Sequence, residues 1–233
     1  MTYTVIARCP KSGQLGIGIA TYSLAVGGYC PAIKGGLGAV STQAFVNLKL
    51  GSLALRLLGL GFAPTKTLGE LIDDDPDASY RQLGIIDNDG RTAVHTGADT
   101  RPWSGHLTGD GFITMGNVLA GEAVLAAMAD AFAASAGSDL DERLLLALEA
   151  GRDAGGQQTA DGMHLNERSA ALIIHDHRDY GHMDLRVDAH DTAVEELRRV
   201  HRVYKPFVPY YQLRHDDPAN TPAQDVWAAE NLP

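Results

Sequence analysis

Thr2, the second residue of the chain, has a hydroxyl that could act as a nucleophile. It is small enough for methionine aminopeptidase to remove Met1, which would leave Thr2 with a free α-amine. That amine, with an ordinary pKa of about 7.7–8.0, could accept the hydroxyl proton near neutral pH. Nucleophile and base would then share one residue, a recognised variant of triad chemistry. Many unrelated chains also begin Met-Thr, so a chance occurrence is the alternative.

Four polar residues are candidates to surround such a nucleophile. Ser41, Thr42 and Gln43 end a predicted strand. They could present hydroxyl and amide groups to a cleft beside Thr2, or they could be ordinary polar residues of a strand. Asn117 precedes a predicted helix, so its amide could either donate to an oxyanion or cap that helix.

Three larger side chains could contact a small substrate. Trp103 and His106 lie on a predicted glycine-rich loop, where they could bind substrate or simply pack. Arg168 lies on the last predicted hairpin, and its guanidinium could bind a carboxylate. The alternative for Arg168 is an ion-pair network with Asp184 and Arg186 on the same hairpin.

A histidine-rich segment invites a metal-site interpretation. It consists of His175, Asp176, His177, Asp179, His182 and Asp184. The spacing differs from zinc motifs such as His-Glu-x-x-His. A solvated hairpin turn is therefore favoured, and we expect neither a metal nor a cofactor.

The composition limits the classes of partner. The chain has 233 residues, a net charge of −10 and two cysteines. This acidic balance argues against a nucleic-acid partner, because phosphate binding relies on basic clusters. With no signal-peptide pattern and no long apolar span, we expect a cytoplasmic protein with no membrane partner. Glycine is abundant, at 26 residues, and we expect many glycines around Thr2, where backbone would approach a substrate closely.

The hydrophobic pattern predicts strands paired by local turns, alternating with helices. Strands are expected over 2–7, 14–20, 37–45, 82–86, 92–96, 169–175 and 182–187. Helices are expected over 48–60, from residue 64 to the acidic run at 73–75, and over 119–136, 140–154 and 192–203. This order indicates antiparallel sheets with helices packed outside. We expect one domain over 1–203. The aromatic, proline-rich tail at 204–233 should pack on its own domain or on a neighbouring subunit, which favours a homo-oligomer.

Six ordered segments carry a resemblance to a known family. They are TYTVIAR at 2–8, GAVSTQA at 38–44, RQLG at 81–84, GNVLAG at 116–121, RSAAL at 168–172 and DLRVD at 184–188. Together they resemble the bacterial family of unknown function DUF1028, which is usually placed among the N-terminal-nucleophile (Ntn) hydrolases. The resemblance implies an α+β fold, a four-layer αββα sandwich of two antiparallel sheets. It also implies amide hydrolysis with Thr2 as the nucleophile.

The resemblance extends to one more residue and fails at another. Lys34 falls near the place of the active-site lysine of proteasome-like Ntn subunits, where it would lower the pKa of the nucleophile. The aspartate that usually follows the second strand has no counterpart in the segment 20–23, which reads ATYS.

These observations lead to a first hypothesis and two alternatives. The first is an Ntn-type hydrolase that cleaves a non-peptide C–N bond of a small amide, ureide or lactam. Thr2 would be nucleophile and base, Lys34 a pKa modulator, and Asn117 with the region of Thr42 the oxyanion donors. The missing aspartate favours the main alternative, an inactive small-molecule-binding or scaffold protein on the same fold. A metal hydrolase built on the histidine-rich segment is the weaker alternative.

Overall fold

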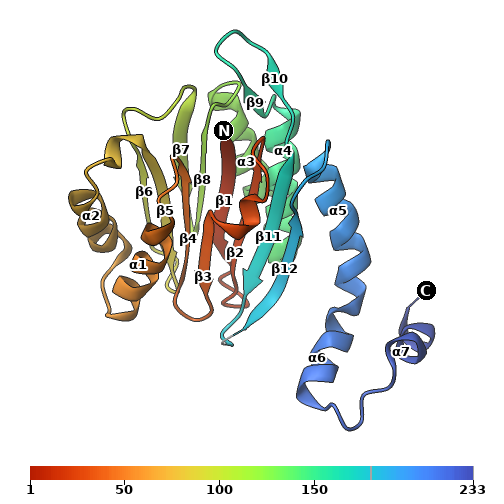
Figure 1. Cartoon of the computed structure of the whole chain (residues 1–233). Coiled ribbons are helices and arrows are strands. Elements are labelled where there is room, and N and C mark those ends of the chain that lie inside the picture. The colour runs from red at the N-terminus through yellow and green to blue at the C-terminus, as the bar shows by residue number, and fades with distance from the viewer. Residues whose placement is uncertain (179, 233) are drawn as a thin grey trace.

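The first strand, β1 (Thr2–Arg8), is buried along almost its whole length. A strand buried on both faces must lie between two packed layers. Its backbone pairs antiparallel with β2 (Leu15–Thr21) on one edge and with β8 (Phe112–Asn117) on the other. The computed structural model, which describes residues 1–178 and 180–232, builds two sheets around this central strand (Figure 1).

Two antiparallel sheets form the middle of the molecule. The first also contains β7 (Ser104–Gly109), β11 (Ser169–His175) and β12 (Gly181–Val187), in the order β12-β11-β2-β1-β8-β7. The second contains β3 (Pro31–Lys34), β4 (Gly38–Ala44), β5 (Arg81–Asp87) and β6 (Thr92–Thr96), in that order. The facing sides enclose one apolar core, which includes Ile6, Ile17, Ile19, Ala39, Ile86 and Met115.

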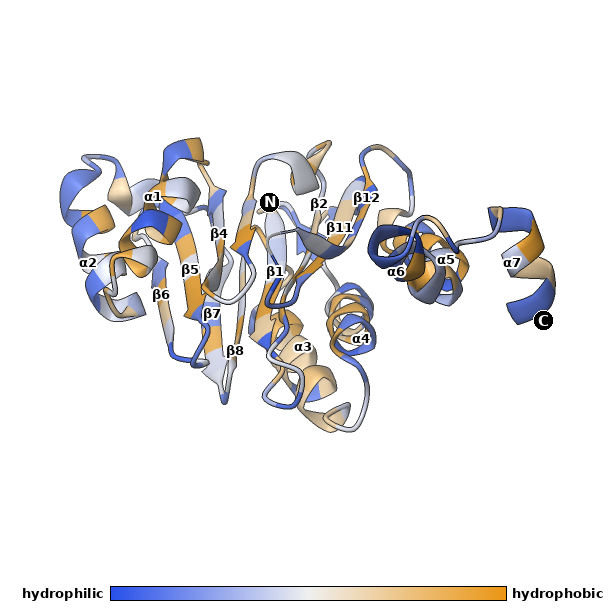
Figure 2. Ribbon diagram, turned by 90° about the horizontal axis from the view of Figure 1, so that it is seen from below, coloured by the Kyte–Doolittle hydropathy of each residue, from blue (hydrophilic) through white to orange (hydrophobic). Residues whose placement is uncertain are grey.

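Helices cover the outer face of each sheet. The first sheet packs against α3 (Glu122–Ala134), α4 (Leu140–Asp153) and α5 (Ala193–Tyr204). The second packs against α1 (Leu48–Gly59) and α2 (Pro64–Asp74). Viewed from below, α1 and α2 lie beside one sheet and α3 and α4 beside the other (Figure 2). The four-layer αββα sandwich expected from the sequence is therefore confirmed.

Several elements differ from the sequence prediction. Residues 103–106, expected in a loop, mostly belong to β7, which pairs with β8 in a hairpin. The following helix, α3, begins at Glu122 rather than at residue 119. The edge strand β3 was also missed. Short pieces complete the described chain: η1 (Val26–Gly28), η2 (Ala78–Tyr80), β9 (Gln157–Gln158) and β10 (His164–Leu165).

The glycines are spread over both ends of the sandwich instead of being concentrated around Thr2: Gly116 lies against the backbone of Thr2, whereas others lie at the far end. Those with positive φ include Gly13, Gly36, Gly90 and Gly111, which form hairpin turns. Gly90 and Gly111 lie close to Arg8, the last residue of β1. These turns therefore lie at the end of the sandwich opposite Thr2, and they close hairpins rather than line a substrate site.

The tail forms an arm of helices, although its sequence shows little periodicity. It consists of η3 (Lys205–Phe207), α6 (Val208–Asp216) and α7 (Gln224–Asn231), and it leads away from the sandwich (Figure 1). Prolines at the start of η3 and α6 fit the first helical turn, where their missing N–H groups cost no hydrogen bond. The Tyr210 and Trp227 rings, 5.2 Å apart, join α6 to α7. None of the described helices is both long and apolar enough to span a membrane.

Candidate active site

Thr2 opens β1 between two polar neighbours. In the backbone ladders Thr2 is paired with Thr21 of β2 and with Asn117 of β8. Side chains alternate along a strand, and Ile6 of β1 belongs to the core between the sheets, so Thr2 also faces that space. Thr2 is only 6% exposed. The fold thus places this hydroxyl inside one end of the sandwich, near the N-terminus (Figure 1).

Two hydroxyls converge on the carbonyl oxygen of Met1. Thr2 Oγ1 donates a hydrogen bond to this oxygen at 2.6 Å. Thr21 Oγ1 donates to the same oxygen and lies 3.2 Å from Thr2 Oγ1. The backbone N–H of Ser23 in turn donates to Thr21 Oγ1 at 3.2 Å, which helps to fix its position. The site can therefore hold a carbonyl group beside a nucleophilic hydroxyl.

The α-amine of Met1 lies in the same site. It donates to Asn117 Oδ1 at 2.6 Å. Burial is the main reason why its pKa falls from 8.0 to about 6; Cys30 acts in the opposite direction, and the charge of Arg101 also lowers the pKa. An amine buried here is largely neutral at pH 7, and a neutral amine can accept a proton.

A chain of amide groups holds Asn117 in place. Asn117 Nδ2 donates to Gln82 Oε1 at 3.1 Å, and Gln43 Nε2 donates to the same oxygen at 2.7 Å. Gln43 Oε1 accepts from Thr4 Oγ1 at 2.6 Å. Because its N–H groups face Gln82, Asn117 presents an oxygen to the amine. With Met1 in place the Asn117 oxygen faces the amine. Asn117 does not cap α3, because Gly121 precedes that helix. The oxyanion role stays a prediction.

Gln82 is the centre of this network, although it was not among the residues predicted from the sequence. Its Nε2 lies 2.9 Å from each of three acceptors, Thr96 Oγ1 and the carbonyl oxygens of Gly105 and Gly116. Thr96 Oγ1 is also 2.8 Å from Nδ1 of His106. The network therefore links His106 to the amine, but His106 itself lies at the sheet edge, away from Thr2. The available signal was a glutamine at an inward-facing position of a buried strand.

A small pocket adjoins the amine. It has a volume of about 150 Å³ and is lined by Met1, Ser23, Ala44, Phe45, Arg101, Asn117 and Val118. Ala44 and Val118 adopt positive φ values of 71° and 57°, which are unfavourable for residues with a Cβ, especially a β-branched one. Strained backbone of this kind is concentrated at functional sites. Ala44 is the last residue of β4, and Val118 directly follows β8; both line the pocket.

The polar side chains at the end of β4, those of residues 41–43, point to two different faces of the second sheet. Ser41 and Gln43 point into the space between the sheets, because they alternate with Val40, which packs toward the helices. Thr42 therefore faces the helix side and does not reach Thr2. The Ser41 hydroxyl is buried and has no hydrogen-bond partner among the described residues.

Lys34 lies far from Thr2, which contradicts the role implied by the resemblance. It pairs with Gly38 at the turn of the β3–β4 hairpin and is exposed. The next residue, Gly35, touches the backbone of Asp176 beyond β11, at the end of the sandwich where β1 finishes. A seven-residue strand separates the two ends, about 20 Å at roughly 3.3 Å per residue.

Trp103 and Arg168 do not line the pocket beside the amine, although the N–H of Arg168 donates to the carbonyl oxygen of Thr21 at 2.8 Å. Trp103 packs against the core beneath α3 and α4, with its ring over Gly105. Arg168 lies over the ring of Tyr22, 5.2 Å from its centre. Arg186 pairs instead with Asp184 at 2.7 Å, so the predicted network does not include Arg168.

The histidine-rich hairpin forms a small ion cluster. Asp176 pairs with Arg178, and His182 lies 3.9 Å from the same carboxylate. Asp179 lies outside the described residues. Within residues 1–178 and 180–232, no three His, Cys, Asp or Glu side chains are close enough to share a metal ion.

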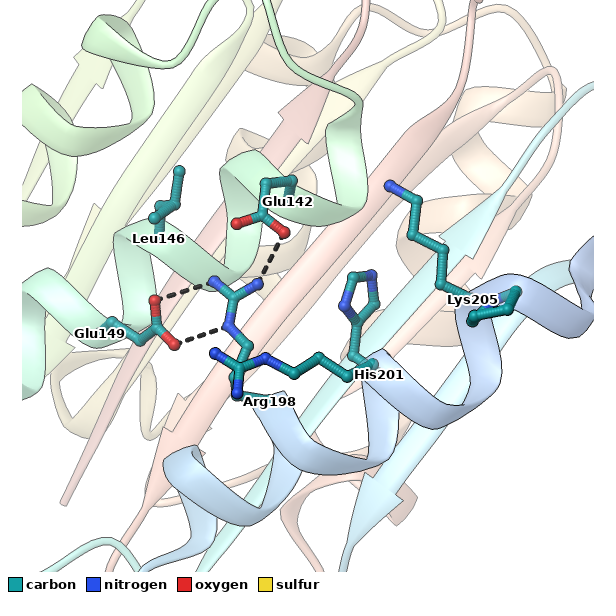
Figure 3. A pocket seen from close by; sticks show the side chains of 8 residues that line it. Glu142, Leu146, Glu149, Arg198, His201 and Lys205 are labelled. Atoms are coloured by element: carbon teal, nitrogen blue, oxygen red, sulfur yellow. Dashed lines mark hydrogen bonds and ion pairs between the residues drawn. The ribbon is translucent and has the colours of Figure 1, made fainter. Parts of the chain in front are cut away.

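A larger hollow than the one beside the amine lies between α4 and α5. It has a volume of about 600 Å³. Figure 3 shows Arg198 between Glu142 and Glu149. Its guanidinium lies 2.6 Å from the Glu142 carboxylate and 2.7 Å from that of Glu149. His201 lies on the same helix as Arg198. His201 Nε2 is hydrogen-bonded to Asp141 Oδ2 at 2.6 Å, so the cluster connects α5 to α4. Its lining contains no hydroxyl or thiol nucleophile.

These features define the class: an αββα sandwich with a hydroxyl, an amine and a small pocket at the start of its central strand. The chain belongs to DUF1028, a family of unknown function, whose sequence pattern matches residues 2–197. The arm lies beyond that match.

Comparison with solved structures supports this membership. The DUF1028 protein SPO2555 from Silicibacter pomeroyi has a TM-score of 0.78 and 29% identity, over 88% of this chain and 89% of that one. Weaker similarity extends to Anbu (ancestral beta-subunit) from Yersinia bercovieri, with a TM-score of 0.43 and 13% identity over 95% of this chain and 98% of that one. HslV from Trypanosoma brucei has a TM-score of 0.43 and 12% identity, over 75% and 99%. A search of curated proteins finds no match.

Proposed function

We propose that this protein is an amidohydrolase in which Thr2, after removal of Met1, attacks the carbonyl carbon of a small amide, ureide or lactam. The observation that carries the proposal is the pair of hydroxyls, Thr2 Oγ1 and Thr21 Oγ1, on one carbonyl oxygen. Removal of Met1 vacates this end of the site, so that the oxygen of a substrate carbonyl can accept from Thr21 Oγ1 near the place of the Met1 oxygen. The adjoining pocket, about 150 Å³ with Met1 in place, favours a small substrate over a protein segment.

The first half of the reaction acylates Thr2. Its oxygen bonds to the substrate carbon while its proton passes to its own α-amine. The oxyanion formed accepts a hydrogen bond from Thr21 Oγ1. The C–N bond then breaks, the ammonium returns a proton to the leaving nitrogen, and an acyl ester remains on Thr2.

The second half releases the acid. Water gives a proton to the same α-amine and attacks the ester carbon, and the C–O bond to Thr2 breaks with return of that proton. Asn117 Oδ1 accepts from the Met1 amine in this structure. In the processed chain we propose that the same oxygen orients the new α-amine of Thr2, because Thr2 is the residue paired with Asn117 in the β1–β8 ladder. Asn117 is thus a positioning residue for the base.

Removal of Met1 provides the test. The same chain is prepared with Met1 retained and with Met1 removed by methionine aminopeptidase, and both are assayed on a simple amide, a ureide and a lactam. The processed chain should turn over at least one of them about a hundredfold faster or more, because only it carries a free amine on the nucleophile. Equal rates for both chains would contradict the proposal.

An inactive binding protein is the second candidate. Around Thr2 Oγ1, within the described residues, the hydrogen-bond partners are the Met1 carbonyl and Thr21 Oγ1, and both are uncharged. This role predicts calorimetric binding of a small amide to the processed chain with no product formed. Product formation would exclude it.

We also propose that the arm pairs the protein with a second copy of itself. Val203, near the end of α5 where the arm begins, is 57% exposed, and Val226 of α7 is 47% exposed; no residue of α7 is buried. The arm leads away from its own sandwich, which leaves these apolar side chains accessible to a second copy (Figure 1). Light scattering of the full chain should give at least twice its 24.8 kDa mass. Changing both valines to aspartate should yield the monomer, whereas changing the neighbouring Asp225→Asn should not. A monomeric native chain at all concentrations would refute the pairing.

A further inference from the structure

The pocket beside the amine contains a single charged side chain besides the N-terminus itself. That side chain is Arg101; the other lining residues are neutral. Its own backbone carbonyl accepts from the N–H of Val118 at 3.2 Å. Val118 directly follows Asn117, which holds the amine. The position of Arg101 is therefore tied to the catalytic strand end through one backbone hydrogen bond.

The guanidinium of Arg101 is available to a ligand. It is exposed and lies over the ring of Phe45, 5.5 Å from the ring centre. Stacking on an aromatic face holds the planar group without using its N–H donors. Within residues 1–178 and 180–232, no carboxylate lies at ion-pair distance from Arg101. Arg81, Arg91 and Arg198, by contrast, pair with aspartates or glutamates.

The charge of Arg101 acts inside the site. The protein has a net charge of −10, so an unpaired cation at a pocket is a local exception that attracts anions. Arg101 and Met1 line the same pocket, so the guanidinium charge lies close to the N-terminus. A planar guanidinium binds a carboxylate through two parallel hydrogen bonds.

We infer that Arg101 binds a carboxylate of the substrate, so that the protein acts on small amides or ureides that also carry a carboxylate a few atoms from the scissile bond. Phe45, 46% exposed, supplies an apolar wall for the short linker. This inference rests on the proposed function for the reaction, but the carboxylate site itself is independent of turnover.

Matched substrates test the inference in the processed protein. N-Acetylglycine carries the carboxylate, and N-acetylglycinamide replaces it by a neutral amide. Arg101→Gln should lower kcat/KM for N-acetylglycine by about tenfold to a hundredfold, the usual range for a charged hydrogen-bonded pair. The same variant should leave kcat/KM for N-acetylglycinamide unchanged. Arg101→Lys should recover part of the loss. The control, Arg56→Gln on the exposed surface of α1, should change kcat/KM for neither substrate. Equal losses for both substrates would overturn the inference.

Binding separates this inference from the proposed function. The Thr2→Ala protein lacks the nucleophile. In this background, calorimetry measures the affinity for N-acetylglycine with Arg101 intact and with Arg101→Gln. Binding that depends on Arg101 supports the site even if no turnover is found in the native protein. Binding unchanged by Arg101→Gln overturns it, even if turnover is found. Inorganic phosphate serves as a second anion, and tighter Arg101-dependent binding of phosphate would contradict the assignment to a carboxylate.

Discussion

Replacing Thr2 by alanine is expected to lower the turnover of small amides by at least about a thousandfold, because the nucleophile is lost while the pocket remains. Alanine is also small, so Met1 removal is preserved and processing is held constant. Thr2→Ser keeps both hydroxyl and amine and should stay within about tenfold of the native rate. The measurement is steady-state kcat/KM on the best substrate of the amide panel.

Two controls separate chemistry from folding. The Thr2 hydroxyl hydrogen bond contributes about 1 kcal/mol to stability, so Thr2→Ala should fold normally. Thr108→Ala, at an exposed threonine of β7, should leave the rate unchanged. Activity that survives Thr2→Ala would point to another nucleophile, and the buried hydroxyl of Ser41, which lacks a partner among the described residues, would be the next to test.

Replacing Gln82 by leucine is expected to lower the free energy of unfolding by about 3–5 kcal/mol. Leucine has a similar volume but leaves the Gln43 and Asn117 amides and the Gly116 carbonyl without their partner in a buried space. Each unsatisfied buried group costs about 1–3 kcal/mol. Chemical denaturation measures the change.

A surface glutamine provides the matched comparison. Gln224→Leu, at the exposed start of α7, makes the same chemical change where water satisfies the lost group, and it should cost less than about 0.5 kcal/mol. If Gln82→Leu lowered the free energy of unfolding as little as Gln224→Leu, the hydrogen bonds of Gln82 would not stabilise the site. Reduced activity in a folded Gln82→Leu protein would further show that Asn117 needs this support.

The layers of the fold could be predicted because their signals are local. The Asn88-Asp89-Gly90 turn lies between β5 and β6, as its type of sequence indicates. β7 was missed because its sequence, SGHLTG, has two glycines and few β-branched residues. The pairing of β1 with β8 joins residues more than a hundred positions apart, and no local pattern encodes such a contact.

The candidate site shows the same limit. Thr2 was identified from its chain position and Asn117 from its residue type, and the structure brings them together. The role for Lys34 was wrong because the β3–β4 hairpin carries it to the other end of the sandwich. Gln82 and Arg101 were missed because their importance comes from their neighbours. Arg101 reaches the pocket through the backbone contact with Val118, which depends on the complete fold.

The central claim is that Thr2, freed of Met1, becomes acylated during turnover. Acid-quenched mass spectrometry of the N-terminal peptide, taken during turnover by the protein from its natural host, tests this directly. The account predicts a peptide that begins at Thr2 and carries the mass of the substrate acyl group. A peptide that retains Met1, or an active enzyme in which the acyl group is on another residue, would contradict it.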